Sequence, residues 1–401
     1  GAPGIAVQSS AAYRQALADN RVLVDAGERE RKIAAEMEAL EKQTGLKVVP
    51  DPGLAREVVY LNEYPRVILG AFDEKFLAIP REVLITVMRK HQMYFALTGP
   101  DGRLAPRFLA VINMDEDRQG LIRQGHERVL KARLVDAEFF WHGDRKRSLA
   151  DRVPALGQVL FQESLGSYLE KSKRLAQLAG YLAEKTHFDI AFIKAVQEAA
   201  RLCKTDLTTD MVKEITELQG VMGGLYAREE GLPEAVWKAI YDHYRPEGMD
   251  DRLPGTPGGA VLALADKLDT ITGMLALGFT PTGSKDPFGL RRLANGVYRI
   301  LLEQGLDLDL EAAFREAHRT LAGKVAVPWE ELRPAIATFL ETRLRFFYQT
   351  AGFRYDEINA VIDRSLFRPL DGRRRLDALQ AIRPVAAFTS IFKAKKRIQN
   401  I

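Results

Sequence analysis

The hydrophobic pattern of the chain changes near residue 120, and this change restricts the possible folds more than any other feature of the sequence. From Val58 to Ile112 the apolar residues form short runs that are rich in β-branched and aromatic side chains, which is typical of strands. These runs are separated by Pro, Gly and Asp: VVYL, RVILGAF, KFLAI, MYFAL and RFLAVIN. After residue 120 the apolar residues recur at helical spacing almost to the end. The sequence therefore predicts a mainly α-helical protein with an N-terminal α/β section.

Local signals predict further elements in the N-terminal section. Residues 28–43 have the pattern of a charged amphipathic helix. Three apolar residues share one face of this helix: Ile33, Met37 and Leu40. Residues 81–91, REVLITVMRKH, predict a second helix. Residues 99–102, Gly-Pro-Asp-Gly, predict a hairpin turn between MYFAL and RFLAVIN.

Loops rich in Pro and Gly divide the helical part of the chain. The two clearest loops are residues 245–259 and 278–288. Between them, residues 260–277 predict a helix that is apolar nearly all round, so we expect it to be buried. A last helical region runs from residue 329 to the end. Other helices are expected at about residues 127–141, 152–186, 188–205, 207–229 and 233–243.

Cysteine content and hydropathy exclude several classes of protein. The only cysteine is Cys203, so neither an intrachain disulfide nor a cysteine-based zinc site is possible, and a reducing, cytoplasmic setting fits best. No run of about 18 uncharged apolar residues is present, so we expect no membrane span. The first ten residues lack an initiator Met and a signal-peptide pattern, and they are interpreted as the edge of an excised fragment.

The distribution of charge is more informative than the net charge of +4. Residues 81–180 hold 17 Lys and Arg against 12 Asp and Glu, and residues 330–401 hold 14 against 8. Residues 1–80 are slightly acidic, with 10 against 12. Local basic surfaces on a nearly neutral protein suit an RNA partner. Solvated helix faces explain the same distribution equally well.

Four residues of the central helices resemble part of a metal-dependent hydrolase site. Lys204, Asp206, His243 and Asp266 follow an order similar to that of the HD-domain superfamily of helical phosphohydrolases, and Asp266 lies in an Ala-Asp-Lys-Leu stretch like the final Asp of those sites. Such a site needs imidazoles and carboxylates around a divalent metal. Here the adjacent His-Asp pair is missing and a lysine stands in its place. We therefore expect a degenerate pocket with no metal and no catalytic residue, in which Asp266 is a buried hydrogen-bond acceptor and His243 a packing residue. The alternative is a pocket that binds phosphate, with Lys204 supplying the charge.

Basic residues elsewhere are candidates for contact with RNA. Lys285, Arg291 and Arg292 lie at the start of a helix that we expect to open with Asp286-Pro287, and helix starts favour anions. A second set, placed beside aromatic residues on one helix, is Arg128, Lys131 and Arg133. For both sets the alternative is a capped or solvated helix surface. Charge alone makes candidates of two further groups: Arg373-Arg374-Arg375 and the run KAKKR at 393–397.

Several long stretches resemble one protein family. In order, FDEKFLAIPREVLITVMRKHQMYFAL, GHERVLKARLVDAEFFWHGD, CKTDLTTDMVKEITELQGVMGGLYA, ALADKLDTITGML and PTGSKDPFGLRR are similar to the beta subunit of bacterial heterotetrameric glycyl-tRNA synthetase. The resemblance extends over nearly the whole chain from about residue 20. One departure is His126, which stands where a GNER-like motif of the family has Asn.

The resemblance implies a role, partners and a domain order. In that enzyme the alpha subunit uses ATP and Mg to activate glycine, while the beta subunit binds tRNA. The chain is then a central fragment, without the N-terminal portion and the anticodon-binding domain, that positions glycine tRNA for aminoacylation by the alpha subunit. Its partners are glycine tRNA, the alpha subunit and a second beta subunit. The implied domains are residues 1–150 as a mixed α/β body section, 151–305 as an HD-like helical domain, and 306–401 as a helical linker and body region.

Two other classes of function remain open from the residues alone. One is a metal-dependent HD-type nucleotide phosphohydrolase, which would carry a bound transition metal. The other is a purely structural scaffold for assembly, which would have no direct contact with RNA.

Overall fold

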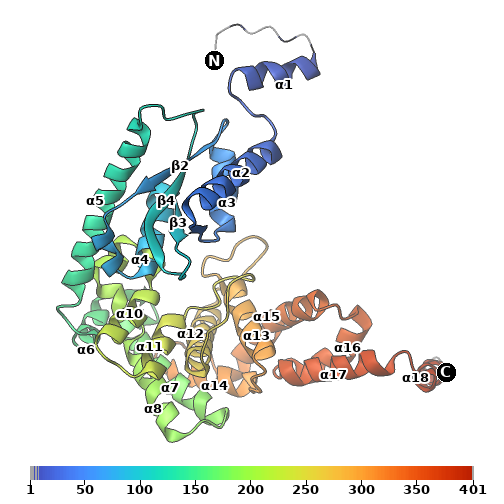
Figure 1. The fold of residues 1–401 in the computed structure, drawn as a ribbon. Helices are drawn as coiled ribbons and strands as arrows, with labels where there is room; N and C mark the ends of the chain where they lie inside the picture. Colours follow the sequence, from blue (N-terminus) through green and yellow to red (C-terminus); the bar gives the residue numbers. More distant parts are fainter. Residues whose placement is uncertain (1–3, 5–6, 8, 400–401) are drawn as a thin grey trace. The chain divides into compact units, whose positions relative to one another are not determined.

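The computed structural model describes residues 4, 7 and 9–399. It divides into two compact units, whose elements are labelled in Figure 1. Unit 1 consists of Gly1–Lys146 and Asp210–Leu218, and unit 2 consists of Arg147–Thr209 and Gln219–Ile401. Among the described residues, none of the helices combines the length and apolar character that crossing a membrane requires. The three-part division expected from the sequence stays a prediction.

Unit 1 contains a small antiparallel sheet with the strand order β1-β3-β4-β2. Its strands are β1 (Lys47–Val48), β2 (Arg66–Ala71), β3 (Phe95–Thr98) and β4 (Leu104–Ile112). Strand β2 pairs with β4 along its whole length, from Arg66 opposite Ile112 to Ala71 opposite Arg107. The predicted hairpin turn between β3 and β4 is confirmed, because the Gly102 N–H donates to the Gly99 carbonyl at 3.0 Å.

Unit 1 also contains helices and short helical turns. They are α1 (Ser10–Asp19), α2 (Ala26–Thr44), α3 (Pro52–Leu61), η1 (Glu74–Ala78), α4 (Arg81–Gln92), α5 (Leu121–Asp144), α9 (Asp210–Glu214) and η4 (Thr216–Leu218). The predicted helices at 28–43 and 81–91 are confirmed as α2 and α4.

Two of the predicted strands are wrong, and capping side chains explain both errors. Residues 58–61 belong to α3, because the Asp51 carboxylate accepts a hydrogen bond from the Leu54 N–H at 2.8 Å and Pro52 starts the helix. Residues 75–79 lie in and directly after η1, whose start Asp73 caps by accepting from Lys75. In both places the cap starts a helical turn that then includes β-branched or aromatic residues.

The sheet buries apolar side chains on both faces. On one face the predicted stripe of α2 is confirmed: Ile33 is 4% exposed, with Met37 and Leu40 packed around the same cluster. On the other face Phe108 of β4 stacks on Tyr94, with ring centroids 4.5 Å apart. The buried members of the first cluster are Ile33, Leu54, Val58, Val59, Val67, Phe95, Leu97, Ala105 and Leu109.

Unit 2 is almost wholly helical. Its principal helices are α6 (Leu149–Arg152), α7 (Tyr168–Lys185), α8 (Ile190–Leu202), α10 (Val221–Glu229), α11 (Glu234–Asp242), α12 (Pro257–Ala276), α13 (Leu290–Glu303), α14 (Leu310–Thr320), α15 (Trp329–Thr350), α16 (Tyr355–Ser365), α17 (Pro369–Ile382) and α18 (Ala386–Gln399). Shorter elements are η2 (Val153–Gln158), β5 (Leu160–Gln162), β6 (Gly166–Ser167) and η3 (Thr205–Thr208).

Helix α12 lies at the centre of unit 2, as its sequence predicts. It packs against α7, α8, α11, α13, α14 and α15, and nearly all its side chains are buried. The predicted helix at 152–186 is partly wrong, because η2 and the β5–β6 hairpin precede α7. Helix α7 begins at Tyr168, where Ser167 and Glu170 form a reciprocal capping box.

Candidate functional site

The four residues of the expected degenerate pocket lie close together in unit 2. Lys204 directly precedes η3 and Asp206 lies within it. His243 follows the last residue of α11, and Asp266 projects from the buried α12. All four are buried, with exposed fractions between 0 and 8%. The pocket is therefore built by helices that pack around α12.

Lys204 occupies the space between His243 and Asp266. Its Nζ atom lies 2.9 Å from His243 Nε2 and 2.9 Å from Asp266 Oδ2. It also lies 3.7 Å from the centroid of the Tyr244 ring. The other imidazole nitrogen, Nδ1, faces the Ile240 carbonyl at 2.6 Å. His243 therefore donates from Nδ1 and accepts the ammonium proton at Nε2, which is the arrangement of a neutral imidazole.

Helix α7 adds two more cations, which no signal in the sequence had singled out. Lys171 Nζ lies 3.0 Å from Asp266 Oδ1 and 2.9 Å from Asp269 Oδ2. Arg174 holds Asp269 in a forked pair, with Nε–Oδ1 at 2.6 Å and Nη2–Oδ2 at 3.2 Å. Together with Lys204 and His243 these residues form a buried ion-pair network. Its members are Lys171, Arg174, Lys204, His243, Asp266 and Asp269.

The charges in this network stabilise one another. Burial raises the pKa of Asp266, but the ammonium groups of Lys171 and Lys204 outweigh burial and lower that pKa overall. Burial lowers the pKa of Lys204, but Asp266 outweighs it and the pKa is raised overall. Burial and the neighbouring Lys204 hold the pKa of His243 well below its usual range. At neutral pH Asp266 and Asp269 are therefore ionised, Lys204 is charged and His243 is neutral.

Asp206 faces a different set of partners. Its Oδ2 atom accepts hydrogen bonds from the Gly220 N–H at 2.5 Å and the Gly223 N–H at 3.1 Å, while its buried Oδ1 atom has no hydrogen-bond partner among the described residues. Burial raises the pKa of Asp206 to about 6, with the two amide groups opposing the shift. Asp206 therefore anchors the start of α10 (Val221–Glu229) and is not a member of the ion-pair network.

This arrangement does not fit a divalent metal. A metal at the point where His243 and Asp266 converge would have to displace the Lys204 ammonium, which carries a positive charge and cannot ligate. In the part of the chain that the structure describes, no group of three or more His, Cys, Asp or Glu side chains is arranged to hold a metal ion. The chemistry of the pocket is that of a structural ion-pair network.

The burial of Lys204 corrects one expectation from the sequence. Lys204 was expected to offer its charge to a phosphate, but it is 1% exposed and its ammonium group is already bound by Asp266 and His243. Removing it from those partners would leave a buried carboxylate with less compensation. We therefore exclude Lys204 from the residues that can contact RNA in this structure.

The loop from α12 to α13 places three cations at the surface. Lys285 and Arg292 are exposed and Arg291 is half-buried. Within the described residues, none of the three side chains forms an ion pair or a hydrogen bond with a carboxylate. The helix start itself is already capped, because the Asp286 carboxylate accepts from the Leu290 and Arg291 N–H groups at 2.8 and 2.9 Å.

The helix that follows this loop begins later than expected. Helix α13 starts at Leu290 after Gly289, which has a left-handed φ of 64°, so Pro287 is not at the first helical position. We therefore exclude the binding of a phosphate by free amide groups at the start of this helix. Any anion held here would be held by the side chains of Lys285, Arg291 and Arg292.

The second candidate set lies on the exposed side of α5 in unit 1. Arg128, Lys131 and Arg133 are all exposed, and the described part of the chain supplies no carboxylate partner for them. The buried side of the same helix contributes Leu130, Leu134, Ala137 and Trp141 to the core. Phe139, which the sequence associates with these cations, is 71% exposed.

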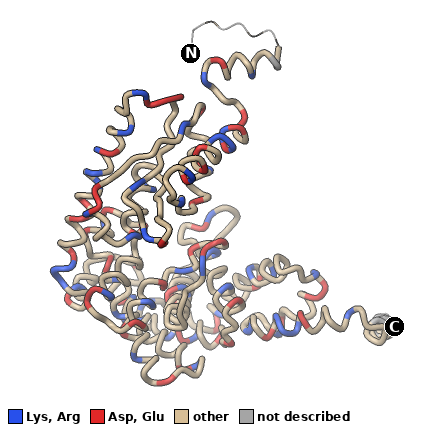
Figure 2. The backbone as a smooth tube through the Cα atoms, viewed as in Figure 1, with Lys and Arg blue, Asp and Glu red and all other residues tan. Residues whose placement is uncertain are grey.

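The arginine cluster on α17 (Pro369–Ile382) differs from these sets because each of its members is paired. The partners are Asp377 for Arg373 at 3.0 Å, Asp307 for Arg374 at 3.4 Å, and Asp371 for Arg375 at 2.6 Å. Figure 2 shows basic and acidic residues interspersed along the backbone here and in the other helices. Of the run at 393–397, the side chains other than that of Ala394 lie outside the described residues.

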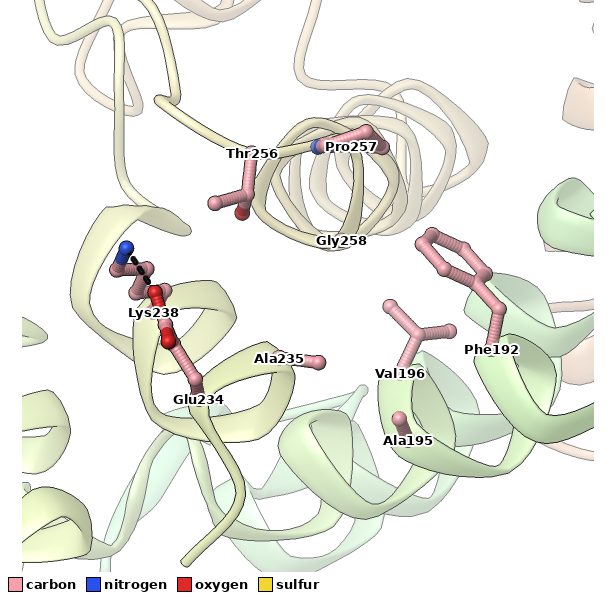
Figure 3. A pocket seen from close by; sticks show the side chains of 9 residues that line it. All are labelled: Phe192, Ala195, Val196, Glu234, Ala235, Lys238, Thr256, Pro257 and Gly258. Carbon is pink, nitrogen blue, oxygen red and sulfur yellow. Dashed lines mark hydrogen bonds and ion pairs between the residues drawn. The ribbon is translucent and has the colours of Figure 1, made fainter.

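A cavity of about 260 Å³ opens beside the start of α12. Figure 3 shows Phe192 and Val196 of α8 facing the first turn of α12 across this cavity, with an ion pair between Lys238 and Glu234 of α11 at its edge. Thr256 at the edge caps its own helix by accepting from the Gly259 N–H at 3.1 Å. The lining is mainly small and apolar, so this cavity does not offer the charges that a phosphate needs.

Comparison with known proteins places the chain in a family. The profile of the glycyl-tRNA synthetase beta subunit matches residues 2–363. The glycine–tRNA ligase beta subunit of Acidithiobacillus ferrooxidans is 42% identical over 398 residues, which cover 99% of this chain and 57% of that relative. The corresponding protein of Magnetococcus marinus is 42% identical over 405 residues, with 100% and 57% covered, and that of Moorella thermoacetica is 40% identical over 398 residues, with 98% and 57% covered.

These relatives are subunits of an aminoacyl-tRNA synthetase. The chain belongs to the glycyl-tRNA synthetase beta subunit family, as its sequence resemblance predicts. It spans about 57% of the length of the relatives it matches.

Proposed function

We propose that the chain is a tRNA-binding, non-catalytic part of a glycine–tRNA ligase beta subunit. In this proposal it positions glycine tRNA for aminoacylation by an alpha subunit that uses ATP and Mg, and the chain itself holds no cofactor. A second beta subunit takes part in the assembly, which acts in the cytoplasm. The helical region 151–305 is an HD-like domain whose metal position has been taken over by Lys204.

One observation carries the RNA-binding part of this proposal. Lys285, Arg291 and Arg292 lie on the α12–α13 loop and the first turn of α13, exposed or half-buried and without carboxylate partners among the described residues, whereas the arginines of α17 are all paired. Cations without internal partners are free to neutralise phosphates, and each neutralised phosphate releases counterions. The unpaired set on α5, Arg128, Lys131 and Arg133, is proposed as a second contact surface.

The rival proposal of a metal-dependent phosphohydrolase has less support. It requires a divalent metal between Asp206, His243 and Asp266, where Lys204 lies 2.9 Å from both His243 and Asp266. Asp206 turns its Oδ2 atom to the amides of Gly220 and Gly223 instead. The proposal of a purely structural scaffold gives the unpaired cations no role. It predicts that the chain does not bind tRNA, whereas ours predicts that it does.

A pair of matched variants tests the proposal. The triple variant K285Q/R291Q/R292Q should bind glycine tRNA more weakly than the parent chain. The slope of log affinity against log salt should fall in magnitude by about 0.7–0.9 for each phosphate that the variant no longer neutralises. Filter binding or fluorescence anisotropy at several salt concentrations measures both quantities.

The control variant R373Q/R374Q/R375Q removes the same amount of charge from the paired cluster. It should keep nearly the affinity and the salt slope of the parent. If both variants lost the same affinity for glycine tRNA, the effect would be one of net charge and not of the α12–α13 loop. Undiminished binding by K285Q/R291Q/R292Q would show that this loop does not contact the tRNA.

A further inference from the structure

The loop between α12 and α13 exposes two aromatic rings beside its unpaired cations. Phe279 is 42% exposed and Phe288 is 37% exposed. Their ring centroids lie 5.0 Å apart and the planes are inclined at 62°. The residues between them include Thr282, Gly283 and Ser284, which are small, polar or both, and exposed. The two rings therefore form a small exposed apolar surface within a loop that also carries exposed polar and basic residues.

Backbone hydrogen bonds hold the main chain that carries both rings. The Phe279 N–H donates to the Met274 carbonyl at 2.9 Å, directly after Gly278 with its positive φ of 82°, which is a Schellman-type end of α12. Within the loop, Thr282 and Lys285 exchange two backbone hydrogen bonds of 3.1 and 2.8 Å.

The other end of the loop is equally well held. The Gly289 N–H donates to the Asp286 carbonyl at 3.1 Å, in a turn that contains Phe288, and the Asp286 carboxylate caps α13. The chain thus fixes the backbone at both ends of the loop through its own turns.

We infer that Phe279 and Phe288 are a stacking platform for an unpaired nucleotide of the bound RNA. Lys285, Arg291 and Arg292 would hold the phosphates on either side of that nucleotide. This inference rests on the proposed tRNA-binding function and gives it a substrate class, namely a single-stranded segment or end of the RNA.

The chemistry of the loop favours an unpaired nucleotide over a duplex. Bases within a duplex already stack on each other and do not present a face to a protein ring, whereas splayed bases of single strands stack on aromatic side chains. Cations next to an aromatic surface bind the backbone of the same strand. A protein partner would instead require a larger continuous apolar area than these two rings provide.

The exposed Phe346 on α15 offers a matched comparison. It is 44% exposed, and its ring centroid lies 6.2 Å from that of Phe347. The candidate RNA-contacting cations lie on other elements, so Phe346 serves as the control position.

The test uses the whole 401-residue chain and two RNA hairpins that are identical except for a short single-stranded 3′ extension. The variant F279L/F288L keeps apolar side chains and removes both flat rings. We expect it to lose about tenfold in affinity for the extended hairpin and to bind the blunt hairpin as the parent does, with an unchanged salt slope. The control F346L should bind both hairpins like the parent.

The outcomes separate this inference from the proposed function. A parent chain that binds neither the hairpins nor glycine tRNA overturns both. A parent that binds the extended hairpin, together with F279L/F288L binding it equally well, overturns the platform alone. Equal losses for the extended and blunt hairpins would also overturn it, because the rings would then not read an unpaired nucleotide. The single variants F279L and F288L provide the same readings if the double variant does not fold.

Discussion

Asp266 shows how a single carboxylate organises the centre of unit 2. Its two oxygens face the ammonium groups of Lys204 and Lys171 at 2.9 and 3.0 Å, and Lys204 also serves His243. Buried ions are costly to remove from water and are tolerated only when each is compensated. Lys204 is therefore needed to compensate the buried carboxylate of Asp266. Removing its side chain should lower the stability of the chain.

Replacing Lys204 by Met tests this dependence. The variant K204M keeps an unbranched apolar side chain but leaves Asp266 with only one ammonium partner and His243 Nε2 without its donor. We expect the free energy of unfolding to fall by about 3–5 kcal/mol, the range for breaking one member of a buried pair. Chemical denaturation measures the change.

The matched control is K285M, which makes the same substitution at an exposed lysine without a carboxylate partner among the described residues. Its free energy of unfolding should stay within about 0.5 kcal/mol of the parent. If K204M proved as stable as K285M, the ion-pair network would not be a source of stability in unit 2.

At the scale of elements, two glycines let α10 and α11 approach closely. A Cβ atom on Gly224 would lie 2.4 Å from Tyr241 Cβ and 2.7 Å from Tyr241 Cα. A Cβ on Gly223 would lie 2.9 Å from Ile240 and 3.2 Å from the Asp206 carboxylate. At these two positions α10 therefore has no room for a side chain against α11 or against Asp206.

The substitution G224A should separate these helices. Because the obstructing atoms belong to the α11 backbone and its first side-chain carbon, they cannot move aside freely, and we expect a decrease of about 1–3 kcal/mol in the free energy of unfolding. The opposite result is expected for G125A in the second turn of α5, where the added Cβ meets nothing within 4 Å. That change should stabilise the chain by about 0.4–1 kcal/mol. Thermal unfolding of the two variants measures both changes. If G224A left the free energy of unfolding unchanged, the close packing of α10 and α11 would be contradicted.

Elements with strong local signals were predictable from the sequence. The periodic stripe of α2 and the Gly-Pro-Asp-Gly turn between β3 and β4 each identify their element within a few residues. The runs at 58–61 and 75–79 misled because β-branched and aromatic composition favours strands, while the caps Asp51 and Asp73 favour helical turns. Here the capping hydrogen bond outweighs propensity.

The candidate site was predictable only in part, because some of its residues lie far apart in the sequence. The convergence of Lys204, His243 and Asp266 follows from the family resemblance. The partners Lys171 and Arg174 lie 95–99 residues from the atoms they bind on α12, and no local pattern marks such a contact. The three-residue spacing of Asp266 and Asp269 on one helix was the available signal, since it places both carboxylates on the same side.

At the scale of the whole molecule, the chain separates two uses of positive charge. In unit 2 buried cations bind buried carboxylates and hold helices together, while the exposed cations of the α12–α13 loop have no carboxylate partners among the described residues. The net charge of +4 does not reveal this separation. Unit 1 has its own exposed set on α5.

The central claim, that RNA contacts the α12–α13 loop and not the paired arginines of α17, has a direct test in site-specific photocrosslinking to glycine tRNA. Benzoylphenylalanine would replace the exposed Ser284 in the loop or, as the comparison, the exposed Ala378 beside the arginine cluster. The account predicts a strong crosslink from position 284 that salt weakens, and little from position 378. Crosslinking from position 378 with none from position 284 would contradict it.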